Sequence, residues 1–135
     1  MFEKKYSNLK DVLEAGGNQF NALFNAFSDK GTIARSLSVS ENDFDFETLD
    51  LSKGIIKGTI SGSKDVPYFL EINSQTKLII HNCHDFKSRR ALNKKFCKHL
   101  AKLFLILKEK NENESISLLE KISEKINMWE FQTST

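Results

Sequence analysis

The sequence has one proline and only two cysteines, and none of its apolar runs reaches the roughly 18 residues that a membrane span requires. Its first residues, MFEKKYSNLKDVLEAGG, also lack the apolar core of a signal peptide. These absences predict a soluble, intracellular protein that does not associate with membranes. In an intracellular protein, two cysteines are more often metal ligands than partners in a disulfide.

Sequence motifs of several enzyme classes are missing as well. The chain contains no HExxH pattern of zinc proteases, no GxxxxGK[ST] phosphate-binding loop and no serine in a nucleophile elbow. We therefore expect a protein that is not an enzyme and has no small-molecule substrate.

The composition is that of a folded domain. Hydrophobic residues make up 39% of the 135 residues and charged residues 28%, which is typical of a globular protein rather than a disordered one. A chain of this length is expected to fold as a single domain, residues 1–135, with a core of its own.

Apolar residues at helical spacing predict helices in three places. Residues 7–28 should hold two helices separated by Gly16 and Gly17, a mostly buried helix should begin near residue 98, and a C-terminal helix should lie within 109–135. The residues of these three apolar stripes are Phe20, Leu23, Phe24 and Phe27; Leu100, Leu103, Phe104 and Leu107; and Ile116, Leu119, Ile122, Ile126 and Trp129. We expect the last stripe to pack on the protein's own core, with partner binding as the alternative.

Short runs rich in β-branched and aromatic residues predict an antiparallel meander. The runs cover residues 32–39, 54–60, 67–72 and 76–81, and turn-forming residues separate the later ones. The acidic segment 40–50 is expected to be a loop or an edge segment. The predicted fold class is α+β, with the meander followed by a helix and flanked by an N-terminal extension (1–53) and a C-terminal helix (109–135).

Both cysteines and all three histidines lie within nineteen consecutive residues. His81 and Cys83 are two apart at the end of a predicted strand, where alternate side chains share a face. Cys97 and His99 are also two apart, but such residues diverge by about 200° on a helix. Cys97 should therefore precede the helix and His99 should lie in its first turn. His84 alternates to the opposite strand face and is expected outside the group.

Two sulfur and two nitrogen donors suit one tetrahedral Zn²⁺, for which His81, Cys83, Cys97 and His99 are the predicted ligands. Four protein ligands close the coordination sphere, which is typical of a structural zinc; without His81 the sphere would be open to a catalytic role. The competing interpretation is a pair of buried free cysteines beside surface histidines. The mirrored HxC and CxH pairs favour the metal site.

The region after the first pair is strongly basic. Residues 86–110 contain nine cationic residues and one acidic residue, a local charge of +8, against −6 for the rest of the chain. Such asymmetry is typical of a surface that binds phosphates. The predicted nucleic-acid contacts, in a loop held outward by zinc, are Lys87, Arg89, Arg90, Lys94 and Lys95. A solvated loop that serves solubility is the alternative.

The segments HNCHDF and CKHLAKL resemble the two halves of SWIM zinc fingers, whose pattern is Cys-x-Cys, a variable gap, then Cys-x-His. The matching residues are Cys83, Asp85, Phe86, Cys97, Lys98 and His99, within a resemblance over about residues 54–108 that includes Tyr68 in the preceding strand. It implies a ββα core with one structural zinc. The chain departs from the family at His81, where a cysteine is usual, and this changes the site's charge from −1 to 0.

The resemblance also bears on partners. SWIM domains are found in proteins that contact DNA or other proteins, including small accessory subunits of RecA-like recombinases. It therefore implies either a nucleic-acid-binding adaptor in a larger assembly, for DNA or RNA, or a protein-binding accessory subunit without nucleic-acid contact.

Overall fold

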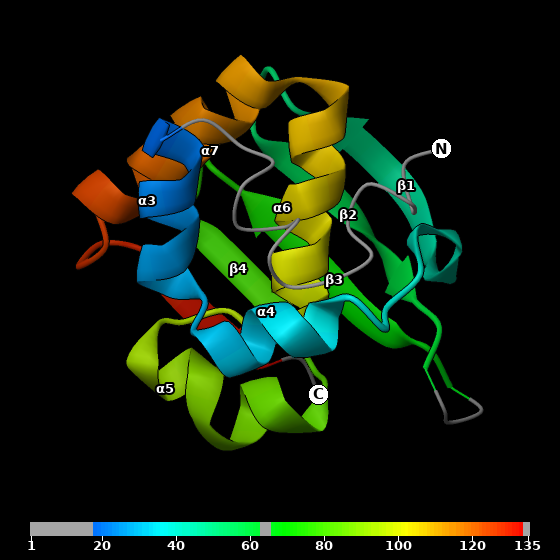
Figure 1. Cartoon of the computed structure of the whole chain (residues 1–135). Coiled ribbons are helices and arrows are strands. Elements are labelled where there is room, and N and C mark those ends of the chain that lie inside the picture. Colours follow the sequence, from blue (N-terminus) through cyan, green and yellow to red (C-terminus); the bar gives the residue numbers. More distant parts are fainter. Residues whose placement is uncertain (1–17, 63–65, 134–135) are drawn as a thin grey trace.

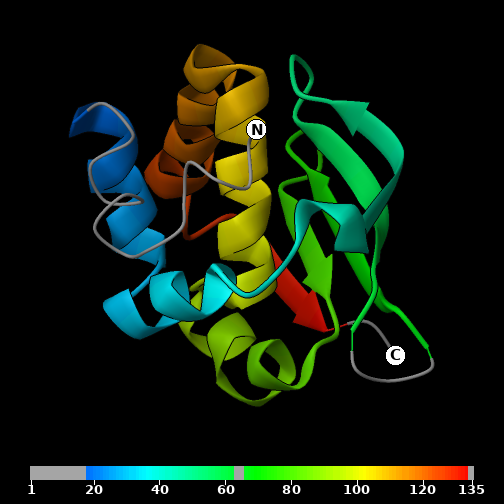
Figure 2. The same cartoon turned by 45° about the vertical axis from the view of Figure 1, so that its right-hand side comes forward.

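A computed structural model describes residues 18–62 and 66–133, so the predictions for residues 7–17, including the role of Gly16 and Gly17, lie outside the described residues. The described chain is mixed α+β, with its helices packed on one face of a five-stranded sheet (Figures 1 and 2). Among these residues, no helix combines the length and apolar character needed to cross a membrane.

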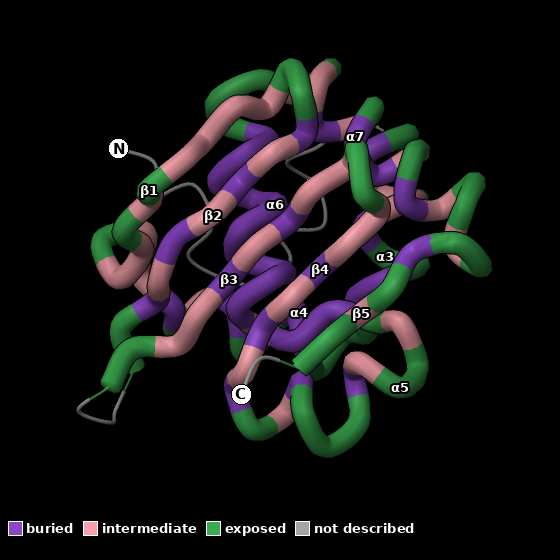
Figure 3. Tube along the Cα trace, turned by 180° about the vertical axis from the view of Figure 1, so that it is seen from behind, coloured by how far each residue is buried: buried purple, intermediate pink, exposed green. Residues whose placement is uncertain are grey.

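The sheet follows the chain order. It consists of β1 (Phe44–Asp50), β2 (Ile55–Ile60), β3 (Tyr68–Asn73), β4 (Leu78–His81) and β5 (Glu130–Thr133), in that spatial order. The first four strands pair antiparallel with their neighbours, which confirms the predicted meander for the runs 54–60, 67–72 and 76–81, and β5 pairs parallel with β4. Figure 3 shows the face that the helices leave uncovered. Along β2, β3 and β4, half-buried residues largely alternate with buried ones.

The prediction of a strand at residues 32–39 is wrong, because helix α4 (Lys30–Ser36) covers most of that segment. The Asp29 side chain caps α4 by accepting a hydrogen bond from the Thr32 backbone N–H at 2.7 Å, which satisfies a free helical amide. Thr32, Ile33 and Ser36 are all buried. The cap and this buried face outweigh the weak preference of β-branched residues against helix.

The charge on Asp29 also supports the cap. Its hydrogen bonds with Thr32, together with smaller effects of Arg90, lower the pKa of the carboxyl from 3.8 to about 2. Because folding lowers the pKa of Asp29, the stability that its ionised carboxylate contributes is fully present above the pKa of the unfolded state. It is therefore present at neutral pH and lost only as the pH falls from about 4 towards 2.

The acidic segment 40–50 forms a 3-10 turn, η1 (Glu41–Asp43), and then the edge strand β1. Of its two predicted forms, the edge segment is therefore correct. Phe44 and Phe46 pack against the core with ring centroids 5.7 Å apart, while Asp45 and Glu47 are exposed. Exposed acidic side chains on an edge strand oppose pairing with another sheet.

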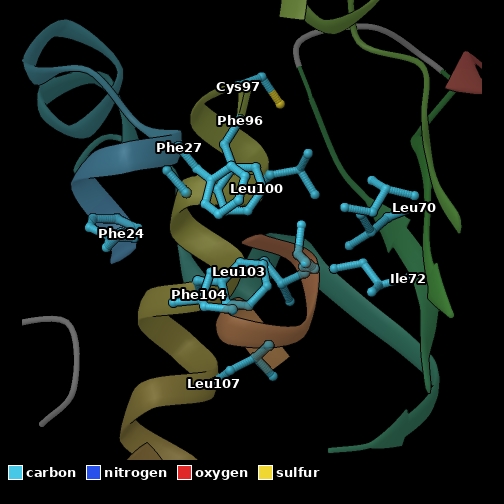
Figure 4. Packing of buried hydrophobic residues seen from close by; sticks show 14 of the residues in the cluster. Phe24, Phe27, Leu70, Ile72, Phe96, Cys97, Leu100, Leu103, Phe104 and Leu107 are labelled. Carbon is cyan, nitrogen blue, oxygen red and sulfur yellow. The ribbon is translucent and has the colours of Figure 1, made fainter. Parts of the chain in front are cut away.

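Helix α6 (Lys98–Lys110) lies between the sheet and helix α3 (Asn18–Phe27), as Figure 2 shows. Every residue from His99 to Lys108 is buried. In Figure 4, Phe96 and Phe104 lie on the α3 side of the core, and the strand residues Leu70 and Ile72 lie on the opposite side. The predicted buried helix is confirmed.

The C-terminal prediction is correct only in part. Helix α7 (Glu112–Glu124) ends before Ile126, and the chain then turns into β5. Trp129 lies beyond the helix but is only 1% exposed, and its indole N–H donates to the Lys121 carbonyl at 3.2 Å. Leu119 and Ile122 are also buried. These side chains pack on the protein's own core.

Replacing Trp129 by Ala should therefore lower the free energy of unfolding by about 3–5 kcal/mol, the usual cost of truncating a buried aromatic residue. The matched control is Met128→Ala next to it, because Met128 is 61% exposed and should change stability by no more than about 0.5 kcal/mol. Urea denaturation in saturating zinc measures both values. Equal values for the two variants would contradict the buried position of Trp129.

Candidate metal centre

Four potential metal donors come from the facing ends of two neighbouring elements. His81 is the last residue of β4, and Cys83 follows it by two residues. Cys97 is the N-cap of α6 and His99 lies in its first turn, as predicted. His81 shares the helix-covered face of the sheet with Ile79, because side chains alternate along β4. The end of β4 and the start of α6 thus bring the two donor pairs together, although residues 84–96 separate them in the sequence.

The donor atoms form a compact group. The ligand atoms of His81, Cys83, Cys97 and His99 all lie within 4.8 Å of one another, and all four residues are buried. The Nε2 atom of His81 lies 3.4 Å from the Nδ1 atom of His99. Two Zn–N bonds of about 2.0–2.1 Å at a tetrahedral angle place their nitrogens about 3.4 Å apart. The group could therefore bind one metal ion.

Surrounding contacts orient these donors. The Nδ1 atom of His81 lies 2.7 Å from the backbone carbonyl of Phe69. Because a carbonyl can only accept, Nδ1 carries the proton, and the Nε2 lone pair faces the other donors. The backbone N–H of Phe86 donates to the Cys83 sulfur at 3.4 Å, which favours a thiolate there. The rings of Tyr68 and Phe86 pack against the His81 ring.

The two thiols differ in acidity. The hydrogen bond from the Cys97 thiol is the main cause that holds the pKa of Cys83 well below its usual value, against the opposing effect of burial. Burial raises the pKa of Cys97 well above its usual value. Cys83 is therefore the more acidic of the two thiols, and Cys97 is the one that keeps its proton to higher pH. A metal ion that binds both sulfurs must displace that proton, so its affinity should depend on pH.

His84 does not belong to the group. It is exposed, and its ring is not among the converging donor atoms. The adjacent carboxylate of Asp85 is engaged elsewhere, since it accepts hydrogen bonds from Arg89 at 2.7 Å and from Arg90 at 3.0 Å.

The prediction of an outward loop between the two donor pairs is wrong. Residues 84–93 are helical, with a π-helical turn, η2 (Phe86–Arg90), followed by α5 (Ala91–Asn93). Phe86 and Phe96 are fully buried, and the Phe96 backbone N–H donates to the carbonyl of Phe27 at 2.8 Å. Apolar anchors near both ends therefore hold the segment against the core.

Arg90 is not the surface residue that the sequence predicts. It is 8% exposed, and its guanidinium pairs with Asp29 at 3.1 Å and with Asp85 at 3.0 Å. These carboxylates raise its pKa, against the opposing effect of burial. Arg90 thus joins the cap of α4 to the segment between the donor pairs, and its charge is used within the chain.

The other predicted basic contacts differ in their surroundings. Lys94 Nζ donates to the carbonyl of Ile126 at 2.9 Å, and Lys95 Nζ donates to the carbonyl of Ala26 at 2.7 Å. Both lysines therefore contribute to contacts between elements. Lys87 is exposed.

The local charge of +8 does not correspond to a surface of that charge. Lys102 and Lys108 of α6 are only 2% and 8% exposed, so with Arg90 three of the nine cationic residues in 86–110 are buried. Long cationic side chains can bury their apolar stems along the core. The sequence count therefore overstates the basic surface.

A pocket of about 390 Å³ opens beside the metal donors. Its lining includes the donor residues Cys83 and His99, the ring of Tyr68, and the cationic side chains Arg35, Arg89 and Lys98. Arg35 is missed by the sequence analysis because it lies in the segment interpreted as a strand. The Asp29 cap signal could have placed it on a helix, but only the tertiary fold brings that helix to this pocket.

The comparisons with known proteins assign no family. The chain matches no protein-family model, and neither the curated proteins nor the solved structures include a significant match to it. The structural evidence on function is therefore the buried His-Cys-Cys-His group and its surroundings.

Proposed function

We propose that this chain is a non-enzymatic SWIM-type protein that binds one structural Zn²⁺ through His81, Cys83, Cys97 and His99. The observation that carries the proposal is the convergence of four buried donors, with the two imidazole nitrogens 3.4 Å apart. Two thiolates with two imidazoles form a donor set that zinc prefers.

The positions of the donors suggest what the ion does. One pair ends the sheet strand β4, and the other pair begins the core helix α6. A shared ion would tie the sheet to that helix and would link the two ends of the intervening segment, residues 84–96. Because four protein ligands complete a tetrahedral sphere, we assign the ion a structural and not a catalytic role.

Elemental analysis of the purified protein tests this proposal. We expect one zinc per chain, and after exchange for Co²⁺ we expect an absorption spectrum of tetrahedral cobalt with sulfur ligands. Protein that folds normally, contains no zinc after purification in zinc-containing buffer and gives no such cobalt spectrum would contradict the proposal.

We further propose that the zinc-bound protein acts as an adaptor that contacts a nucleic acid. The support is a set of cationic side chains beside the metal centre, Arg35, Arg89 and Lys98, with the exposed Lys87 on the same segment as Arg89. Phosphate contacts make affinity fall steeply with salt. Arg90, Lys94 and Lys95 are left out of this set because they bind within the chain.

The alternative is a protein-binding accessory subunit without nucleic-acid contact, of the kind that serves RecA-like recombinases. Affinity purification from native extract with and without nuclease separates the two. A protein partner that stays bound after nuclease treatment supports the alternative, whereas loss of the associated proteins supports the adaptor.

A further inference from the structure

We infer that the pocket beside the metal centre, here called the cationic pocket, is a binding site for one phosphate group. The inference deepens the proposed nucleic-acid contact and rests on it for the source of that phosphate, which is either a nucleic-acid strand or a free nucleotide. Its core residues are Arg35, Arg89 and Lys98.

The three cations come from three different elements of the fold. Arg35 lies on α4, Arg89 lies on η2 and Lys98 is the first residue of α6. Residues so far apart in the sequence converge on one pocket only because the fold packs α4 and η2 around the start of α6 (Figure 1). Three cations that line one pocket suit a phosphate, since each can donate charge-assisted hydrogen bonds to phosphate oxygens.

Among the residues that the structure describes, one carboxylate lines the pocket, and its charge is already neutralised. Asp85 accepts from Arg89 Nε through one oxygen and from Arg90 Nε through the other. The hydrogen bond from Arg89 uses only its Nε, so both of its terminal nitrogens can still donate to a ligand. Asp85 thus positions Arg89 without cancelling the positive charge of the pocket.

The other two cations have donors to spare. Arg35 makes one long hydrogen bond, from Nη2 to the Thr32 hydroxyl at 3.3 Å. In the part of the chain that the structure describes, Lys98 Nζ has no hydrogen-bond or ion-pair partner. Both side chains can therefore bind a ligand without breaking a contact that holds the fold.

The metal-donor residues in the lining would not repel an anion. Cys83 and His99 both line the pocket, and a zinc site with two thiolates carries no net charge, whereas a site with three would carry −1. With His81 as a ligand rather than a third thiolate, these donors are compatible with a bound phosphate.

The size of the pocket suggests more than an inorganic ion. Pockets for small molecules range from about 300 to 1,000 Å³, and this one measures about 390 Å³. The Tyr68 ring, 5.2 Å from the His99 ring, provides an aromatic wall. A Cβ at Gly62 would lie 2.7 Å from that ring, so glycine there leaves Tyr68 in place. The pocket volume is therefore large enough for a phosphate with its attached sugar and base.

The test uses the full-length, zinc-loaded protein and three probes, which are inorganic phosphate, AMP and a labelled single-stranded 12-mer in DNA and RNA forms. The pocket variant is Arg35→Gln with Lys98→Gln. The matched control is Lys30→Gln with Lys110→Gln, which removes the same charge from the opposite ends of the same two helices, where both lysines are exposed. Zinc content and circular dichroism establish that both variants are folded.

We expect the pocket variant to bind the 12-mer about tenfold or more weakly than the control does, because hydrogen bonds to charged groups are lost. The slope of log affinity against log salt should flatten by about 0.7 per phosphate contact removed. If the 12-mer does not bind but AMP or phosphate does, and only the pocket variant loses it, the pocket binds free phosphate compounds and the nucleic-acid contact is wrong.

Two results would overturn the inference. One is that the pocket variant and the control variant bind every probe equally well. If the unmodified protein still binds the 12-mer in that case, the proposed nucleic-acid contact stands but does not involve this pocket. The other is no detectable binding of any probe at low salt, which would remove both the pocket and the nucleic-acid contact.

Discussion

Cys97→Ser is expected to lose the zinc and to disorder the junction between β4 and α6. Structural zinc in small finger peptides contributes apparent binding free energies of about 10–16 kcal/mol, which is comparable to the whole stability of an ordinary domain, about 5–15 kcal/mol. Cys97 is fully buried at the first turn of the core helix. Its replacement should therefore affect the helix as well as the metal.

Zinc content and the fluorescence of Trp129, the only tryptophan in the chain, measure this result. Trp129 directly precedes β5 and lies near the start of β4, because Glu130 pairs with Leu78, so its emission reports whether the core beside that strand stays packed. Removing zinc from the unmodified protein with a chelator should give the same change. Adding zinc back should reverse the change in the unmodified protein but not in Cys97→Ser. A Cys97→Ser protein that retains one zinc per chain would remove Cys97 from the site.

His81→Ala should weaken zinc binding by more than the 10–100-fold that is typical for loss of an outer-shell partner, because it removes a ligand. His81→Cys should retain one zinc per chain, since a third thiolate is also a suitable ligand. The shorter cysteine must draw the end of β4 towards the ion and gives up the hydrogen bond to Phe69. Competition with a chromophoric chelator measures the affinities.

The control for this series is His84→Ala. His84 is exposed and outside the donor group, so its loss should leave zinc affinity unchanged. The cobalt form of His81→Cys should also show stronger sulfur-to-metal absorption than the unmodified protein. If His84→Ala releases zinc and His81→Ala does not, the assignment of the ligands is wrong.

The sequence alone was sufficient for features that depend on local spacing. Two residues that are two apart diverge on a helix, so Cys97 had to precede α6, and the structure places it there. The alternation of β4 put His81 on the covered face. The apolar residues of α6 likewise predicted a buried helix, because their spacing is a local property and a helix with so wide an apolar face must pack against other elements.

Other features depended on contacts between distant segments, and these only the tertiary structure decided. Arg90 is buried because Asp29, sixty-one residues earlier, reaches it, and no local pattern distinguishes it from the exposed Lys87. The pairing of β5 with β4 depends on where α7 ends, and the sequence stripe continues past that point.

The candidate site shows the same division. The spacing of two cysteines and two histidines identifies a metal-binding chemistry, because donor type and reach along a strand or helix are local properties. The pocket beside it does not follow from the sequence, because Arg35, Arg89 and Lys98 meet only when three elements pack together. The sequence thus determined which atoms could bind a metal ion, while the packing of α4, η2 and α6 decided which charges surround it.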